Sequence, residues 1–233
     1  DRVAFCDEVV VVDSGSTDKT CELARAKGAR VVVNTPWPGF VAQRNFATEQ
    51  ASHDWILAVD ADERVTPPLR AEIEAERAQG FAHAGYRIPR VAYYLGRWIR
   101  GTDWYPDPQL RLFDRRRGRW QGKLVHESVR VEGSVGRLRH DMEHLTYRDL
   151  SHHLRTIDSY TTLWAEQAFE EGRRAGVVQA AGACGWAFVR NYLLKGGFRL
   201  GAAGFTVSTL NSYYAFVKLA KLGELERNGG SRR

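Results

Sequence analysis

Two aspartates, Asp60 and Asp62, stand one residue apart at the end of a short apolar run, Trp55-Ile-Leu-Ala-Val59. A run of this kind that stops at polar residues is typical of a buried parallel strand with a site at its carboxyl end. Because alternate residues of a strand share a side, we expect both carboxylates to face the same point. One or two carboxylates plus phosphate oxygens are usual ligands of Mg²⁺. The pair predicts a site for a metal-bound phosphate, although a solvated acidic turn that caps the next helix would use the same residues.

A second polar segment, Asp13-Ser-Gly-Ser-Thr-Asp18, follows the β-branched run Val9–Val12. The Asp13 carboxylate can accept a hydrogen bond from a base or a ribose. Ser16 lies where the next helix is expected to begin, and a helix N-terminus favours an anion. A plain polar turn with a helix cap explains the same residues. On its own, the segment leaves a nucleotide site and a structural turn open.

The elements that would position these residues alternate along the first third of the chain. We expect strands over residues 8–13, 30–34 and 55–59, and helices over residues 19–27, 40–50 and 69–78. Such alternation predicts an α/β fold with a mostly parallel sheet and helices on both faces. Later segments alternate like strands over residues 86–94, 109–113 and 123–131. From about Ser151 the pattern becomes helical, with Leu154, Ile157, Tyr160 or Thr161, and Trp164 at three-to-four spacing.

The composition narrows the class of protein. Hydrophobic residues make up 43% and charged residues 27%, which is ordinary for a globular chain. The net charge of +6 favours anionic partners such as phosphates or lipid headgroups. No run reaches the roughly eighteen apolar residues of a membrane-spanning helix. Three cysteines are too few for a disulfide framework, so we expect a reducing compartment. The sequence begins at Asp1, just before a core strand, and we expect a further strand and helix in front of it.

Three motifs in order resemble glycosyltransferase family 2, the inverting, GT-A-fold group that uses nucleotide-diphosphate sugars. They are Val11-Val-Asp-Ser-Gly-Ser-Thr-Asp18, Gln43-Arg-Asn45 and Val59-Asp-Ala-Asp-Glu63. Pro106–Phe113, Val125-His-Glu127 and the helical end resemble the branch that contains bacterial lipopolysaccharide-core glucosyltransferases. The resemblance covers nearly the whole chain. It implies a GT-A catalytic domain over residues 1–150 and a helical, membrane-associating region over residues 151–233.

The same resemblance implies a donor site. Asp13 and Ser16 would bind the nucleoside, Arg44 would lie near the nucleotide or diphosphate, and Asp60 would face the ribose. Asp62 would hold Mg²⁺ or Mn²⁺. The family's first strand, with an Asn-Glu loop that touches the base, is absent from this sequence.

An acceptor site needs a base, because an inverting transfer removes a proton from the attacking hydroxyl. Glu127 is the candidate, with His126 to orient it or to replace it; a strand with a salt-bridged glutamate on its solvent face is the alternative. The loop and strand around residues 104–111 suit sugar binding through Trp104, Asp107, Gln109 and Arg111. Alternatively, the aromatic residues of this segment belong to the core.

Together these expectations describe a hexosyltransferase that moves a hexose such as glucose from a UDP-sugar to a lipid-linked glycan or lipopolysaccharide-core acceptor. Aromatic and basic residues of the helical end predict peripheral contact with the inner face of the cytoplasmic membrane. We expect no nucleic acid, because the basic run Arg115–Arg119 accompanies no nucleic-acid-binding module.

Three alternatives remain open. The first is an inactive, membrane-associated protein that binds sugar nucleotides. The second is a DxD phosphotransferase with a covalent phosphate on Asp60, which Arg64-Val65 does not fit. The third is a metalloprotease, since His140-Asp-Met-Glu-His144 formally matches the H-x-x-E-H pattern.

Overall fold

The computed structural model describes residues 2–122 and 127–229. The chain forms two compact units: unit 1 comprises Asp1–Arg90 and Pro108–Glu143, and unit 2 comprises Val91–Asp107 and His144–Arg233. The expected division placed everything before residue 151 in one domain. Residues 91–107 instead join the helices of unit 2, because Tyr94 and Ile99 are buried in the same core as Leu200 and Val207.

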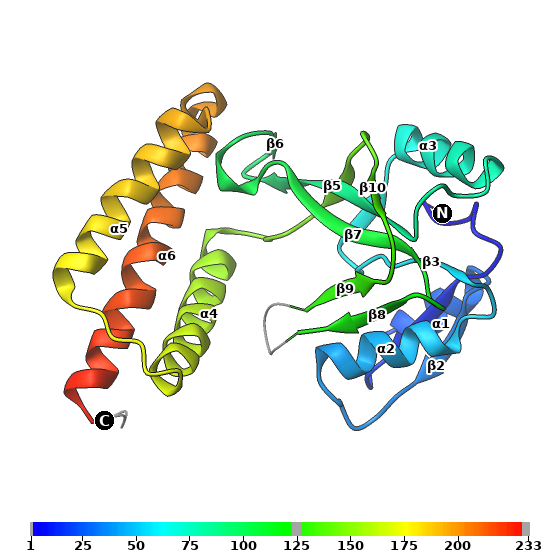
Figure 1. The fold of residues 1–233 in the computed structure, drawn as a ribbon, viewed down its shortest axis with the longest axis horizontal. Coiled ribbons are helices and arrows are strands. Elements are labelled where there is room, and N and C mark those ends of the chain that lie inside the picture. Colours follow the sequence, from blue (N-terminus) through cyan, green and yellow to red (C-terminus); the bar gives the residue numbers. More distant parts are fainter. Residues whose placement is uncertain (1, 123–126, 230–233) are drawn as a thin grey trace. The chain divides into compact units, whose positions relative to one another are not determined.

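Unit 1 is an α/β unit (Figure 1). Its first half contains β1 (Val10–Asp13), α1 (Thr20–Ala26), β2 (Arg30–Val33), α2 (Phe40–Gln50), β3 (Trp55–Leu57), β4 (Glu63–Val65) and α3 (Pro67–Ala78). The remaining strands are β5 (Gly85–Tyr94), β7 (Asp107–Asp114), β8 (Gly118–Gln121), β9 (Ser128–Val131), β10 (Val135–Arg137) and β11 (Met142–His144). The α/β class predicted from the sequence is confirmed.

The sheet is mixed rather than mostly parallel. Its central strands have the order β3-β7-β5-β11-β4, with β10 and β6 (Arg97–Ile99) also paired to β5. The pairs β1–β2 and β5–β10 are parallel, whereas β3–β7, β5–β6 and β8–β9 are antiparallel. The sequence order of alternating strands and helices could not reveal that β7, from much later in the chain, lies beside β3.

Helices cover both faces of this sheet. Leu57 on β3 and Leu112 on β7 pack in a core to which α3 contributes. Their neighbours Ile56 and Phe113 pack in a second core, to which α2 contributes. This alternation is what a pleated strand with two covered faces requires. The antiparallel register pairs Ile56 with Phe113 and Leu57 with Leu112, so the two side chains of each pair pack in the same core.

Unit 2 is mainly helical. It contains β6, the 3₁₀ turn Thr102–Trp104, α4 (Leu150–Glu170), α5 (Val177–Val189), the π-helical turn Arg190–Leu194, the 3₁₀ turn Gly197–Leu200 and α6 (Gly201–Arg227). Asp149 caps α4 by accepting a hydrogen bond from the His152 amide at 2.6 Å. Helix α6 packs along both α4 and α5 (Figure 1).

One glycine sets the close packing at the start of α6. A Cβ added to Gly204 would lie 1.9 Å from the carbonyl oxygen of Gly197. Glycine is favoured at position 201 for a different reason, because the φ of +57° there lies in the left-handed region. The close approach in this segment therefore joins Gly197 to Gly204.

Candidate active site

The Asp60 and Asp62 pair lies in a turn between β3 and β4, not at the end of a strand. β3 stops at Leu57, and the Glu63 amide donates to the Asp60 carbonyl at 2.9 Å. The Asp60 amide in turn donates to Glu63 Oε2 at 3.0 Å. The prediction that strand alternation aligns the two carboxylates was therefore wrong. The turn leaves Asp62 exposed and Asp60 half-buried.

Two arginines hold the Asp60 carboxylate. Arg44 Nη2 on α2 lies 2.8 Å from Asp60 Oδ1, and Arg111 Nη2 on β7 lies 2.5 Å from Asp60 Oδ2. Burial raises the pKa of Asp60, but the charges of Arg111 and Arg44 outweigh it and bring the pKa below its ordinary value. Asp60 is therefore an anion whose two oxygens are both paired. Such a carboxylate is a poor nucleophile for the covalent phosphate that the phosphotransferase alternative requires.

Glu63 holds Arg111 in this arrangement, and it was not among the site residues predicted from the sequence. Its side chain is fully buried, and Glu63 Oε1 lies 2.7 Å from Arg111 Nη2 and 3.0 Å from Arg90 Nη1. Arg111 is itself buried and bridges Glu63 to Asp60. A buried carboxylate persists only with such partners. The sequence signal was its place at the end of the motif Val59-Asp-Ala-Asp-Glu63, which does not indicate burial.

The motif Gln43-Arg44-Asn45 connects three parts of unit 1. Gln43 Nε2 donates to Ser14 Oγ at 2.9 Å, in the loop after β1. Arg44 reaches Asp60, as described above. Asn45 exchanges two hydrogen bonds of 3.0 Å with the backbone of Trp120 on β8. Consecutive residues of one helix thus join the two polar segments that the sequence singled out.

Trp120 and Glu127 complete the group around Arg44. The Arg44 guanidinium lies 4.5 Å from the centroid of the Trp120 ring, and Arg111 lies 5.9 Å from it. Arg44 Nη2 is 3.8 Å from Glu127 Oε1. The predicted base and the predicted donor residues Arg44 and Asp60 therefore lie together. His126, the expected companion of Glu127, is outside the described residues.

Asp13 is held by its own loop. Its Oδ2 accepts from the amides of Gly15 and Ser16 at 2.7 and 2.8 Å, and its Oδ1 accepts from Ser16 Oγ at 2.5 Å. The Ser16 hydroxyl, followed by the two amides, lowers the pKa of Asp13. The carboxylate orders the turn after β1, and a carboxylate with about four acceptor positions keeps capacity for a further donor.

The predicted acceptor residues divide between the two units. Arg111 and half-buried Gln109 belong to unit 1, where Arg111 is fixed by Asp60 and Glu63. Trp104 and half-buried Asp107 belong to unit 2. Trp104 packs against the core of that unit, and its Nε1 donates to Asn211 Oδ1 at 3.1 Å.

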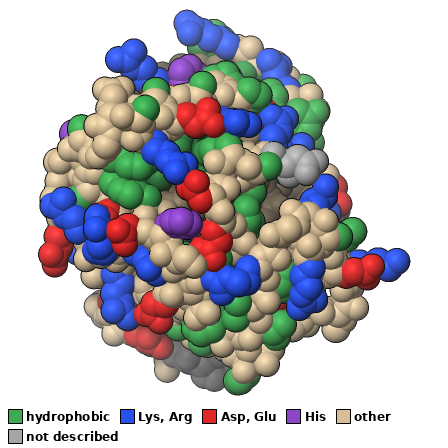
Figure 2. All heavy atoms as spheres, turned by 90° about the vertical axis from the view of Figure 1, so that its right-hand side faces the viewer, with side chains coloured by type: hydrophobic (Ala, Val, Ile, Leu, Met, Phe, Trp, Pro, Cys, Tyr) green, Lys and Arg blue, Asp and Glu red, His purple; other side chains and the backbone are tan. Residues whose placement is uncertain are grey.

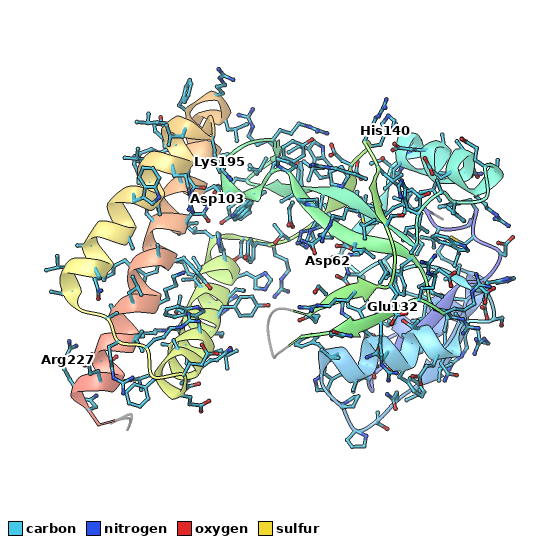
Figure 3. The ribbon with its side chains drawn as sticks, viewed as in Figure 1. Asp62, Asp103, Glu132, His140, Lys195 and Arg227 are labelled. Atoms are coloured by element: carbon cyan, nitrogen blue, oxygen red, sulfur yellow. The ribbon has the colours of Figure 1, made fainter. Side chains whose placement is uncertain are left out.

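The donor set fits a nucleotide-bound cation better than a metal held by protein alone. Among residues 2–122 and 127–229, no three His, Cys, Asp or Glu side chains are grouped so that they could hold a metal ion. Mg²⁺ commonly takes one or two carboxylates and completes its shell with phosphate and water oxygens. Exposed Asp62, labelled in Figure 3, suits that role, and Asp60 with its two arginine partners does not.

The H-x-x-E-H segment is not helical. Met142–His144 is strand β11, and His140 Nδ1 lies 2.9 Å from Glu72 Oε2 on α3 (Figure 3). A metalloprotease site of this pattern needs its histidines on one helix. The segment therefore has a structural role, since Glu72 also accepts hydrogen bonds from the backbone amides of Arg139 and His140.

The basic run after β7 is engaged in local ion pairs. Arg116 lies 2.6 Å from Asp114 and 2.9 Å from Asp54, and Arg119 lies 3.9 Å from Glu49. On the face shown in Figure 2, Lys and Arg side chains are interspersed with Asp and Glu. Two of the four arginines of the run therefore have carboxylates beside them.

Comparison with known proteins gives a consistent result. The sequence model of the family described as "Glycosyl transferase family 2" matches residues 6–143. The chain is 32% identical over 223 residues to the lipopolysaccharide core biosynthesis glycosyltransferase LpsC of Rhizobium meliloti, covering 93% of this chain and 83% of that protein. It is 28% identical to an uncharacterized glycosyltransferase of Rickettsia typhi (94% and 78% covered) and 30% identical to one of Rickettsia bellii (95% and 79% covered).

Proposed function

Because the chain belongs to glycosyltransferase family 2, and is therefore a glycosyltransferase, we propose that it moves a hexose such as glucose from a UDP-sugar to a lipid-linked glycan or lipopolysaccharide-core acceptor, with inversion. One observation carries the proposal: Arg44 contacts both Asp60 and Glu127, so one cation joins a donor-side and an acceptor-side carboxylate. The acceptor class rests on the printed name of the Rhizobium relative.

On the donor side, Asp62 holds Mg²⁺ or Mn²⁺, and Asp13 and Ser16 receive the nucleoside. When bound, the cation would neutralise the departing diphosphate. Asp60 faces the ribose, and Arg44 lies near the phosphates. Arg111 and Glu63 hold Asp60 in place. We therefore assign Arg111 this positioning role in place of the acceptor-binding role expected from the sequence.

On the acceptor side, Glu127 removes the proton from the attacking hydroxyl. A general base acts through a carboxylate within hydrogen-bond reach of that proton. The Glu127 side chain is 18% exposed to solvent, so a substrate can reach it. Arg44, 3.8 Å away, limits the directions in which Glu127 can turn.

The helical unit brings the enzyme to the membrane face where such acceptors are found. No helix in the described part of the chain is both long and apolar enough to cross a bilayer. Large apolar side chains are nevertheless exposed on α5 and after it, including Trp186 at 57% and Leu194 at 67%. Arg190 and Arg199 lie in the same stretch. Exposed apolar and basic residues on helices suit an interfacial contact with anionic lipid.

The experiment is a transfer assay on the full chain, using UDP-glucose, Mn²⁺ and lipopolysaccharide-core or lipid-linked acceptors. We expect metal-dependent transfer that Asp62→Ala and Glu127→Ala each abolish. Full transfer by both variants would overturn the mechanism. Donor binding by calorimetry without turnover on any acceptor would instead indicate an inactive sugar-nucleotide-binding protein.

A further inference from the structure

Unit 2 contains a cavity of about 240 Å³ that the transfer reaction in unit 1 does not use. The residues that argue for a ligand are Trp104, Tyr147, Thr156, Tyr160, Asn211 and Tyr214. They come from the turn before β7, the segment before α4, and helices α4 and α6. All of them belong to unit 2, so the cavity is a property of that unit alone.

The chemistry of the wall is aromatic and hydroxylated, without charge. Four of its members carry aromatic rings, and three of these are tyrosines with a hydroxyl at the tip. No Lys, Arg, Asp or Glu is among the lining residues. His153, which also lines the cavity, is buried, and burial lowers its pKa to about 4, so the ring is neutral near pH 7. A charged ligand would find no counter-charge in this wall.

The wall is held in place by contacts of its own. The Tyr147 ring stacks on His153 with centroids 4.0 Å apart and planes 12° apart. His153 Nδ1 lies 3.1 Å from the Tyr94 hydroxyl. Trp104 lies beside the same two rings, with its centroid 5.5 Å from that of His153 and 5.8 Å from that of Tyr147, and its Nε1 donates to Asn211 Oδ1 at 3.1 Å. Rings fixed in this way lose little conformational entropy when a ligand binds.

The size and polarity of the cavity restrict its occupant. Sites for drug-sized ligands hold about 300–1,000 Å³, so a smaller cavity admits a single ring. A purely apolar occupant would cover the tyrosine hydroxyls of the wall and separate them from water without offering them a hydrogen bond, which is unfavourable. Burial raises the pKa of Tyr147 to about 12 and raises that of Tyr214, so both phenols remain neutral donors and acceptors. A pyranose ring matches this wall, because it has C–H faces for aromatic rings and hydroxyls around its edge.

We propose that this cavity binds one neutral pyranose ring of a saccharide. The proposal rests on the proposed function only in taking that ring as part of a glycan that the enzyme handles. Binding itself needs neither UDP nor metal, so a failure of transfer in unit 1 leaves the binding measurement intact.

The experiment is saturation-transfer NMR on the full chain with methyl β-D-glucopyranoside, sodium D-glucuronate and octyl β-D-glucopyranoside as separate probes. We expect the methyl glycoside to receive saturation, strongest at H-1, H-3 and H-5 on one ring face, and the glucuronate to receive none. Tyr160→Ala weakens this binding by about tenfold, in line with the loss of an aromatic contact and a hydroxyl. Tyr160 is 49% exposed, so its replacement spares the core.

The matched control is Tyr213→Ala, since Tyr213 is exposed to a similar extent, 47%, next to Tyr214 and outside the lining residues. Binding unchanged in the control and weakened in Tyr160→Ala and Thr156→Val supports the proposal. Three results overturn it: no saturation of the methyl glycoside, equal binding by both cavity variants and the wild type, or saturation confined to the octyl chain.

Discussion

The two units differ in the kind of polar side chain that they bury. In unit 1 most of the buried polar side chains of the described residues are charged, Gln43 being neutral, and Arg111 forms ion pairs with both Glu63 and Asp60. In unit 2 the most deeply buried polar side chains beside α4 and α6 are neutral, among them His153 and Asn191. An ionic centre suits a charged ligand such as a nucleoside diphosphate, whereas neutral polar groups and aromatic rings suit an uncharged one.

This contrast predicts that the largest chemical effects come from charges in unit 1. Glu127→Gln keeps the shape of the side chain and removes the carboxylate that we propose as the base. We expect kcat to fall by about 10²- to 10⁴-fold, the usual contribution of a general base, with little change in KM for the donor. Initial rates of UDP release measure this. Glu132→Gln, an exposed glutamate on the same unit (Figure 3), is the control and should retain full rate. A variant at Glu127 with normal kcat would exclude it as the base.

The next largest effect concerns stability. Glu63→Gln leaves Arg111 and Arg90 with one fewer buried counter-charge, and breaking a buried pair costs about 3–5 kcal/mol. Denaturant unfolding should show this loss, with Glu74→Gln as control, because Glu74 forms an exposed pair with Arg70. The double variant Glu63→Gln/Arg111→Met should recover part of the loss. If Glu63→Gln and Glu74→Gln unfold alike, unit 1 is not held by ions as described.

Unit 2 should respond to pH through a single neutral base. The pKa of His153 is about 4 in the fold and about 6.5 in an unfolded chain, so the unfolded chain binds more protons between these values. Stability is therefore complete above pH 6.5 and falls as the pH drops to 4, by about 3 kcal/mol in all. His153→Gln should remove this part of the pH dependence. Denaturation of both proteins at pH 7 and pH 4.5 measures it, and an unchanged difference would show that His153 is not held neutral by burial.

The smallest effect is expected at the exposed apolar residues of α5 and of the turn that follows it. Trp186 and Val189 are exposed on α5, and Leu193 is exposed in the π-helical turn. Trp186→Ser with Leu193→Ser should weaken binding to anionic vesicles by about tenfold and leave unfolding unchanged, since side chains this exposed add little to the core. Sedimentation with vesicles tests this. Tyr213→Ser, on α6, is the control, and equal losses in both would place the contact elsewhere.

Short motifs named three residues that the structure brings together in unit 1, and they named few residues of the neutral cavity. Asp60, Arg44 and Glu127 could be found because each belongs to a local pattern of residues with a chemical meaning. Glu63 belongs to one of these motifs too, but its burial could not be predicted, since it depends on Arg111, which lies 48 residues further along the chain. The strand end at Leu57 was also missed, because the following turn is fixed by the Glu63 side chain.

The helical pattern of α4 shows the same limit. The spacing of Leu154, Ile157, Tyr160 or Thr161, and Trp164 predicted a helix here, and residues at such spacing share one side of it. Ile157 and Thr161 are buried, but Leu154 and Tyr160 are exposed at 40% and 49%, and His153 is buried in their place. Tyr94, on β5, explains the difference, because its hydroxyl provides the buried histidine with a partner. The periodicity of apolar residues shows which positions share a side of the helix. It cannot show that a polar side chain such as His153 has a hydrogen-bond partner on a distant strand.

The division of β5 between the units bears on how the protein is made. Gly85–Arg90 belongs to unit 1 and Val91–Tyr94 to unit 2, and unit 1 resumes at Pro108. During synthesis neither unit can be completed before the other has begun, because β7 and β11 emerge after Tyr94 and Ile99. A fragment that stops at residue 150 would therefore expose Tyr94 and Ile99, whose core partners lie on α4 and α6. Attempts to produce residues 1–150 alone should yield aggregates unless these two side chains are made polar.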